Sequence, residues 1–159
     1  MRRTILGALL LLLLPLLALG KDAPYAEVFG GYSYYHAAGG IHLNGWNASV
    51  AGNLNDWLGI VGDFSGHYGD FHQHAYLFGP QLSYRKLPFV TPFVHSLFGG
   101  ARVNIGLQNA FAMALGGGVD VKVGSHTAVR AVQADYLMTR FGGSTQNNAR
   151  LSFGLVFRF

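Results

Sequence analysis

The feature that most constrains this sequence is an alternation of large apolar side chains with small or polar ones at a period of two residues. It is clearest in the last ten residues, RLSFGLVFRF (150–159). In an extended strand one side would carry Leu151, Phe153, Leu155, Phe157 and Phe159. The other side would carry Arg150, Ser152, Gly154, Val156 and Arg158. Such a strand must pair with a neighbour and cover its apolar side, because a free apolar edge invites aggregation.

The first 20 residues have the three parts of a secretory signal peptide. Arg2 and Arg3 form a basic start, a leucine-rich run follows, and Ala18-Leu19-Gly20 is a small-x-small cleavage site. The apolar run is shorter than the roughly 20 residues that a membrane-spanning helix needs. We therefore predict cleavage after Gly20 and a mature domain of residues 21–159.

The composition of the chain is too apolar for an average soluble protein. Charged residues make up 11% of the sequence, against about 25% in soluble domains. There is no cysteine, so the mature domain is not held by disulfides, and the formal charge of +4 forms no basic patch that would suit nucleic acid. After the leader, no apolar run is long enough for a transmembrane helix.

The alternation predicts eight strands of about ten to thirteen residues. We expect them at 25–36, 43–55, 57–68, 74–86, 89–99, 110–123, 127–139 and 150–159. The connections NDW, KLP and GSH are tight, whereas those between them, such as GDFHQ and RFGGSTQNNA, are longer and rich in turn formers. Short turns at one end and longer loops at the other are typical of outer-membrane barrels. The prediction is an all-β fold, an eight-stranded antiparallel up-and-down transmembrane β-barrel in which the first and last strands pair.

The polarity of the two strand faces separates a membrane barrel from a soluble one. In 57–68 the large apolar side chains are Leu58, Ile60, Phe64 and Tyr68, and between them lie Gly59, Val61, Asp63, Ser65 and His67. A soluble lipocalin-like barrel would need the large side chains inside, and eight strands enclose little room for them. We therefore expect the large side chains to face lipid. The strand 89–99 is apolar on both faces, so its inward face is not defined by the pattern.

The same pattern resembles that of the small OmpA/OmpX-like outer-membrane β-barrel proteins over essentially the whole mature chain. The segment VQADYLMTRFGGSTQNNARLSFGLVFRF is similar to the last hairpin of porin-family, OmpA-like barrels. The terminal set Leu151, Phe153, Leu155, Phe157 and Phe159 resembles the signal that the barrel-assembly machinery recognises. The resemblance implies a bacterial outer-membrane location, outer-membrane lipids as surroundings and that machinery as a partner in biogenesis. OmpA proteins continue into a peptidoglycan-binding domain, which this sequence lacks, so anchoring to the cell wall is not implied.

Charged residues on the inward face are the candidate site. We expect a lumen charge network of Glu27, Asp63, Arg85, His95, Asp120, Lys122, Asp135 and Arg158, because buried charges need partners. Closure of the barrel predicts a Glu27–Arg158 pair. A count of hairpin registers places Asp63 and His95 at similar heights with Gly79 between them, and Asp135 across the lumen. On the strand 127–139, Ala131, Gln133 and Asp135 fall on the inward side, and Arg130 falls on the lipid side near the periplasmic end.

Two patterns resemble functional sites, one a catalytic trio and the other a metal site, but the sequence supports neither. Asp63, Ser65 and His67 share a strand face, but residues two apart lie about 6.6 Å apart, too far for a hydrogen-bonded catalytic relay. His36, His42, His67, His72 and His74 fall in or beside the first two outer loops, where no cysteine completes a site and Asp70 is the one candidate carboxylate. We predict no enzyme activity, no metal and no cofactor.

The function that follows is an integral outer-membrane protein with a structural or surface-interaction role and a lumen plugged by charged side chains. The alternative is a narrow porin-like channel for ions or small solutes. A membrane-embedded hydrolase and a soluble ligand-binding barrel are the remaining classes. No loop sequence identifies a surface ligand.

Overall fold

A computed structural model of the protein describes residues 23–37, 39–104, 108–141 and 143–159. The expected signal peptide, residues 1–20, and its boundary with the mature domain lie outside these ranges. Among the described residues there is no helix of the length and apolarity that crossing a membrane requires.

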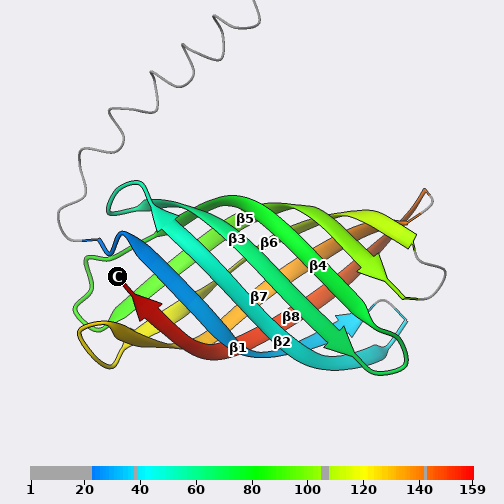
Figure 1. Ribbon diagram of the computed structural model, residues 1–159, viewed down its shortest axis with the longest axis horizontal. Coiled ribbons are helices and arrows are strands. Elements are labelled where there is room, and N and C mark those ends of the chain that lie inside the picture. The colour runs from blue at the N-terminus through cyan, green and yellow to red at the C-terminus, as the bar shows by residue number, and fades with distance from the viewer. Residues whose placement is uncertain (1–22, 38, 105–107, 142) are drawn as a thin grey trace, which may run out of the picture.

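The described chain folds into one closed antiparallel barrel in which every strand pairs with its neighbours in sequence (Figure 1). The strands are β1 (Ala26–Ala37), β2 (Ile41–Asn53), β3 (Leu58–Tyr68), β4 (Gln73–Ser83), β5 (Val90–Val103), β6 (Gln108–Lys122), β7 (Thr127–Phe141) and β8 (Ser144–Arg158). The predicted fold class and strand order are confirmed.

The barrel closes where β1 pairs with β8, with Glu27 opposite Arg158 and His36 opposite Ala149. This pairing leaves no free strand edge. The start of β1 and the end of β8 lie at the same end of the barrel (Figure 1); we call this the terminal end and the opposite one the hairpin end.

The long outer loops expected from the sequence are absent from the described chain. β5 continues to Val103, β7 continues to Phe141 and β8 begins at Ser144, so residues assigned to loops extend the strands. In the β1–β2 connection Gly39 and Gly40 adopt positive φ angles of 99° and 82°. The expectation was wrong because exposed polar residues, such as Thr145 to Asn147, were assigned to a loop although they pair with β7.

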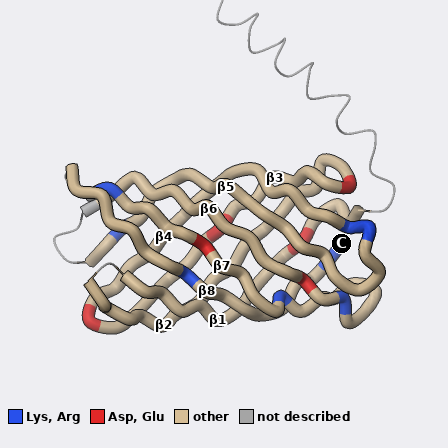
Figure 2. The backbone as a smooth tube through the Cα atoms, turned by 180° about the vertical axis from the view of Figure 1, so that it is seen from behind, with Lys and Arg blue, Asp and Glu red and all other residues tan. Residues whose placement is uncertain are grey.

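Large apolar side chains cover the outside of the wall. On β8 the exposed fractions are 47% for Leu151, 55% for Phe153 and 47% for Phe157, whereas Ser152 and Val156 are buried in the lumen. Charged positions are sparse along the wall and gather toward the two ends, with a few in the middle (Figure 2). The expected direction of the two faces is therefore observed.

The face of β5, which the alternation left open, is defined by the fold. Phe93, His95 and Leu97 are buried in the lumen, and Val94 and Phe98 point outward. Both faces of this strand are apolar because part of the lumen is itself apolar.

That apolar part of the lumen lies toward the hairpin end. We call it the apolar plug; it consists of Tyr35, Leu43, Leu77, Leu97, Ala101, Ala112, Ala114 and Leu137. Its four leucines are at most 1% exposed. Small alanines from β6 face the leucines of other strands, which lets the side chains fill the narrow interior of an eight-stranded barrel.

A β-bulge in β7 changes which residues of the strand face the lumen and which face outward. The pairing of β7 with β8 shifts register between Arg130 and Gln133, and Ala131 and Val132 are both exposed. Before the bulge Ala128 and Arg130 face the lumen; after it Gln133 faces inward. The predictions that Arg130 faces lipid and that Ala131 faces inward were therefore wrong, because they extended one alternation through the whole strand.

Candidate functional site

The lumen between the apolar plug and the terminal end is filled by ion pairs. They join four carboxylates (Glu27, Asp63, Asp120 and Asp135) to four guanidinium groups (Arg85, Arg130, Arg150 and Arg158). The four negative and four positive groups balance in charge, which a poorly hydrated interior requires. The residues form two groups, the central cluster and the mouth cluster.

The central cluster is built around Arg150 of β8, which is fully buried. Its Nη1 donates to Asp63 Oδ1 at 2.7 Å, and its Nη2 donates to Asp135 Oδ2, also at 2.7 Å. Arg150 thus bridges carboxylates from β3 and β7 across the lumen. Its Nη1 also lies 3.2 Å from Ser65 Oγ.

Polar neighbours complete the coordination of these two carboxylates. Asn47 donates to Asp63 Oδ2 at 2.9 Å, and Gln133 donates to Asp135 Oδ2 at 2.8 Å. His95 Nε2 lies 2.6 Å from Asp135 Oδ1. Gly116 makes room for this carboxylate, since a Cβ there would lie 2.1 Å from Asp135 Oδ1. The absence of a side chain at Gly116 therefore provides the space that the Asp135 carboxylate occupies.

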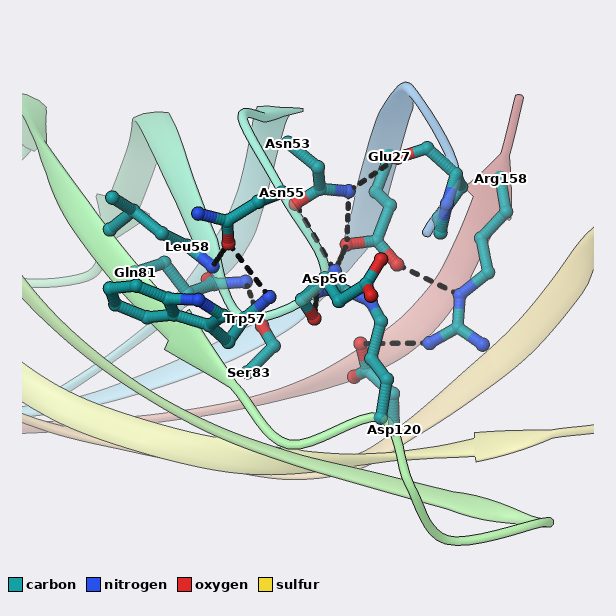
Figure 3. A network of polar contacts seen from close by, with 12 residues as sticks. Glu27, Asn53, Asn55, Asp56, Trp57, Leu58, Gln81, Ser83, Asp120 and Arg158 are labelled. Carbon is teal, nitrogen blue, oxygen red and sulfur yellow. Dashed lines mark hydrogen bonds and ion pairs between the residues drawn. The ribbon is translucent and has the colours of Figure 1, made fainter. Parts of the chain in front are cut away.

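The mouth cluster lies at the terminal end and is centred on Glu27. The closing register of β1 and β8 brings Arg158 Nε to 2.8 Å from Glu27 Oε1, and Arg85 Nη2 reaches Glu27 Oε2 at 2.7 Å. Asn53 joins the same carboxylate, and Asp120 Oδ2 lies 3.8 Å from Arg158 Nη2 (Figure 3). Arg85 follows the end of β4, yet its side chain folds back into the mouth.

Arg130 and Gln133 connect the two clusters. The Arg130 guanidinium donates to both oxygens of Asp120, at 2.7 and 3.1 Å, and its Nη1 donates to Gln133 Oε1 at 2.7 Å. The guanidinium lies between the rings of Phe29 and Phe93, with its Cζ 4.3 Å from each centroid. This cation–π arrangement holds a cation in a largely apolar section of the lumen.

The structure places the residues of the hypothesised network in different situations. Glu27 and Arg158 are in contact, as are His95 and Asp135. No direct contact joins Asp63 to His95 in the described chain; Arg150 and Asp135 lie between them. Lys122, the last residue of β6, is exposed, lines a cavity at the terminal end and has no ion pair among the described residues, so its expected place in the charge network is not observed.

Arg130, Arg150 and Gln133 were missing from that network. Arg150 was detectable, because the alternation of the last ten residues already places it on the same side as Arg158. For Arg130 the alternation did not indicate an inward position. Its charge on an apparent lipid face was the one indication that the phase of the strand changes nearby.

The three residues that resemble a hydrolase trio have other partners. Asp63 and Ser65 contact Arg150, and His67 Nε2 lies 2.9 Å from Ser33 Oγ. Within the described ranges no hydrogen bond joins Asp63, Ser65 and His67 to one another. The geometry therefore gives no support to a catalytic relay at this position.

The mouth contains a cavity of about 520 Å³ lined by Arg85, Lys86, Lys122, Arg158 and residues of the adjoining turns. None of the apolar plug residues contributes to its lining. The cavity is therefore a recess at the terminal end, with the two charge clusters and the plug beyond it.

Solved structures with this architecture include bacterial outer-membrane proteins and designed transmembrane β-barrels. Neisserial surface protein A is 16% identical, with a TM-score of 0.67 over 87% of this chain and 100% of that one. The N-terminal β-barrel domain of Pseudomonas aeruginosa OprF is 14% identical, with a TM-score of 0.62 over 86% of this chain and 100% of that one. The fold is that of the small outer-membrane β-barrels.

The attachment invasion locus protein Ail of Yersinia pestis is a third such structure. It is 16% identical, with a TM-score of 0.55 over 86% of this chain and 100% of that one. No family model and no curated protein matches the sequence. At these identities the similarity shows the fold alone, and at that level the expected resemblance is confirmed.

Proposed function

We propose that this chain is an integral protein of the bacterial outer membrane with a structural or surface-interaction role and a sealed lumen. The outward-facing apolar side chains on the closed wall support insertion into lipid, since a water-soluble barrel would bury them. The outer-membrane barrels that share the fold support the same location.

The proposal of a sealed lumen is supported by the side chains that follow one another along the interior of the barrel. From the terminal end inward, the mouth cluster, Arg130, the central cluster and the apolar plug follow one another. Arg150 and the four plug leucines are at most 1% exposed. A barrel of eight strands is barely wide enough for its own side chains, so we expect such an interior to exclude a hydrated ion.

A narrow channel is the alternative. Its support is the polar path that begins at the mouth cavity and continues through Arg130 and Gln133 to Asp135. The path meets the apolar plug before the hairpin end, and conduction would require the plug residues to separate. We therefore favour the sealed barrel.

Biogenesis would use both ends of the sequence. We propose that residues 1–20 direct export and are removed, and that the barrel-assembly machinery recognises the C-terminal strand. The side chains of the expected signal, Leu151, Phe153, Leu155, Phe157 and Phe159, are exposed on the outside of the barrel, which supports recognition before lipid covers them.

The short connections at the hairpin end limit the surface that a binding partner could contact. A partner would therefore have to bind the ends of the strands. Ail has been solved with the heparin analogue sucrose octasulfate, but nothing in the described hairpin end of this chain identifies an equivalent ligand. The structural role is the better supported of the two.

The first test is the location and closure of the barrel. Membranes are fractionated and the protein is compared by gel mobility with and without heating in detergent. A heat-dependent shift in the outer-membrane fraction is the expected result. Recovery of the protein in the soluble periplasm, without a shift, would contradict the proposal.

The second test is conductance in planar lipid bilayers. Protein from the preparation that shows the mobility shift is inserted, so that silence cannot come from unfolded chains. We expect no steady single-channel current. Steady conductance at a defined level would replace the sealed barrel with the channel.

A further inference from the structure

Two histidines and a tyrosine converge on the outside of the barrel at its hairpin end. His36 near the end of β1 and His42 near the start of β2 are directly opposite each other in the strand register. Their Nδ1 atoms are 3.1 Å apart, and their ring centroids are 4.7 Å apart. Tyr34, two residues before His36 and therefore on the same outward face, places its hydroxyl against His42 Nδ1.

Hydrogen bonding alone does not account for this arrangement. His42 Nδ1 has either one hydrogen or one lone pair, depending on the tautomer. It nevertheless has two close polar neighbours, the Tyr34 hydroxyl and His36 Nδ1. One hydrogen bond satisfies only one of these contacts well. A cation that accepts lone pairs from both imidazoles would satisfy both rings at once.

We propose that His36 and His42, with Tyr34 as a third ligand, form a surface site for a divalent transition metal, with Cu²⁺ bound most tightly. At metal–nitrogen distances of about 2.0–2.1 Å, two nitrogens 3.1 Å apart subtend about 100° at the metal. This angle lies between the right angle of tetragonal coordination, which Cu²⁺ prefers, and the roughly 109° of tetrahedral coordination, which Zn²⁺ prefers, so the preference for Cu²⁺ rests on affinity and not on the angle. Imidazole ligands favour Cu²⁺ over Ni²⁺ and Zn²⁺ in affinity.

The pair is distinct from the other two histidines exposed near the hairpin end. His72 and His74 each contact the Tyr68 ring edge to face, and His74 Nε2 lies 3.3 Å from the Tyr68 hydroxyl. No contact between these two imidazoles occurs in the described chain. They therefore lack the converging nitrogens of the His36–His42 pair.

Each of the three remaining histidines contacts another polar side chain. His67 contacts Ser33 in the lumen, His95 contacts Asp135, and His126 contacts Ser125 in a turn at the terminal end. Over the described ranges no group of three or more His, Cys, Asp or Glu residues is placed to hold a metal. The proposed site is consequently an open one, with two imidazoles and a phenol from the protein and water in the other positions.

The site is tested by titrating Cu²⁺ into untagged, folded protein in detergent, with calorimetry and electron paramagnetic resonance as readouts. We expect one tight equivalent per chain and hyperfine splitting from two nitrogens. His36→Asn and His42→Asn should each weaken binding at least tenfold and leave one nitrogen in the spectrum. Tyr34→Phe should weaken it less, and Ni²⁺ and Zn²⁺ should bind less tightly than Cu²⁺.

The matched control is His74→Asn, which removes another exposed outward-facing imidazole near the same end. It should leave the affinity and the two-nitrogen spectrum unchanged, and heat-dependent gel mobility should show that every variant is folded. Equal losses in His74→Asn and His42→Asn would overturn the proposal. So would unchanged binding in both His36→Asn and His42→Asn, or equal affinity of the urea-unfolded chain.

Discussion

The central and mouth clusters use the same chemistry in different surroundings. In the central cluster the side chains of Arg150, Asp63 and Asp135 are at most 1% exposed. In the mouth cluster Arg85 and Arg158 retain 12% exposure and Glu27 retains 6%, beside a cavity open to the terminal end. The ion-pair distances do not separate the clusters, since both contain pairs at 2.7 Å.

The distance between the charged groups therefore does not indicate how much each ion pair contributes to stability. A charge whose partner is removed in the middle of the lumen has no access to water, and leaving it unpaired is costly. At the mouth, water can replace a lost partner through the adjoining cavity. The stability of the barrel should therefore depend far more on the central cluster.

Loss of Arg150 should have the largest effect. Arg150→Met keeps much of the side-chain volume but leaves Asp63 and Asp135 buried without their shared cation. We expect the free energy of unfolding to fall by about 3–5 kcal/mol. Equilibrium urea unfolding in phospholipid vesicles, followed by tryptophan fluorescence, measures it. A loss no greater than that of Arg158→Met would remove the distinction between the two clusters.

A double-mutant cycle sharpens the same comparison. Asp63→Asn and Arg150→Met, alone and together, should give a coupling energy of about 1–3 kcal/mol, because the two residues share one buried ion pair. The equivalent cycle with Glu27→Gln and Arg158→Met should give a smaller value, because its groups retain access to water. Equal coupling energies would show that the mouth is as dry as the centre.

Glu27→Gln should have an intermediate effect. It leaves Arg85 and Arg158 without their common carboxylate, but both can be hydrated from the cavity. We expect a loss of about 1–2 kcal/mol in the same unfolding assay. The lost charge should also make the stability of the variant more sensitive to anions than that of the original protein, whereas Glu27→Asp should retain most of the stability.

Lys122→Gln should have the smallest effect. Lys122 is exposed and has no ion pair among the described residues, so the change should alter the free energy of unfolding by less than about 0.5 kcal/mol. The result matters because Lys122 lines the mouth cavity beside Arg158. A loss above 1 kcal/mol would place Lys122 in the mouth cluster after all.

The amino-acid sequence was sufficient to predict the strands of the barrel wall and the direction of their two faces. Strand number, the direction of the faces and the pairing of the last strand with the first follow from a two-residue alternation, which is a local property of extended chains. The alternation also places Glu27, Asp63 and Arg158 in the lumen without reference to any other strand. It set the ends of strands less well, because exposed polar residues near the hairpin end look the same in a loop and in a strand.

The contacts between side chains in the lumen could be assigned only from the tertiary structure. Arg150, Asp63 and Asp135 come from three strands, and their meeting depends on barrel stagger and on how far each side chain reaches across the lumen. Arg130 faces inward because of a bulge that a regular alternation does not reveal. A shift of one residue reverses every following side chain, so a local pattern read through a bulge assigns the wrong face. The faces are thus a property of each strand, and the partners are a property of the closed barrel.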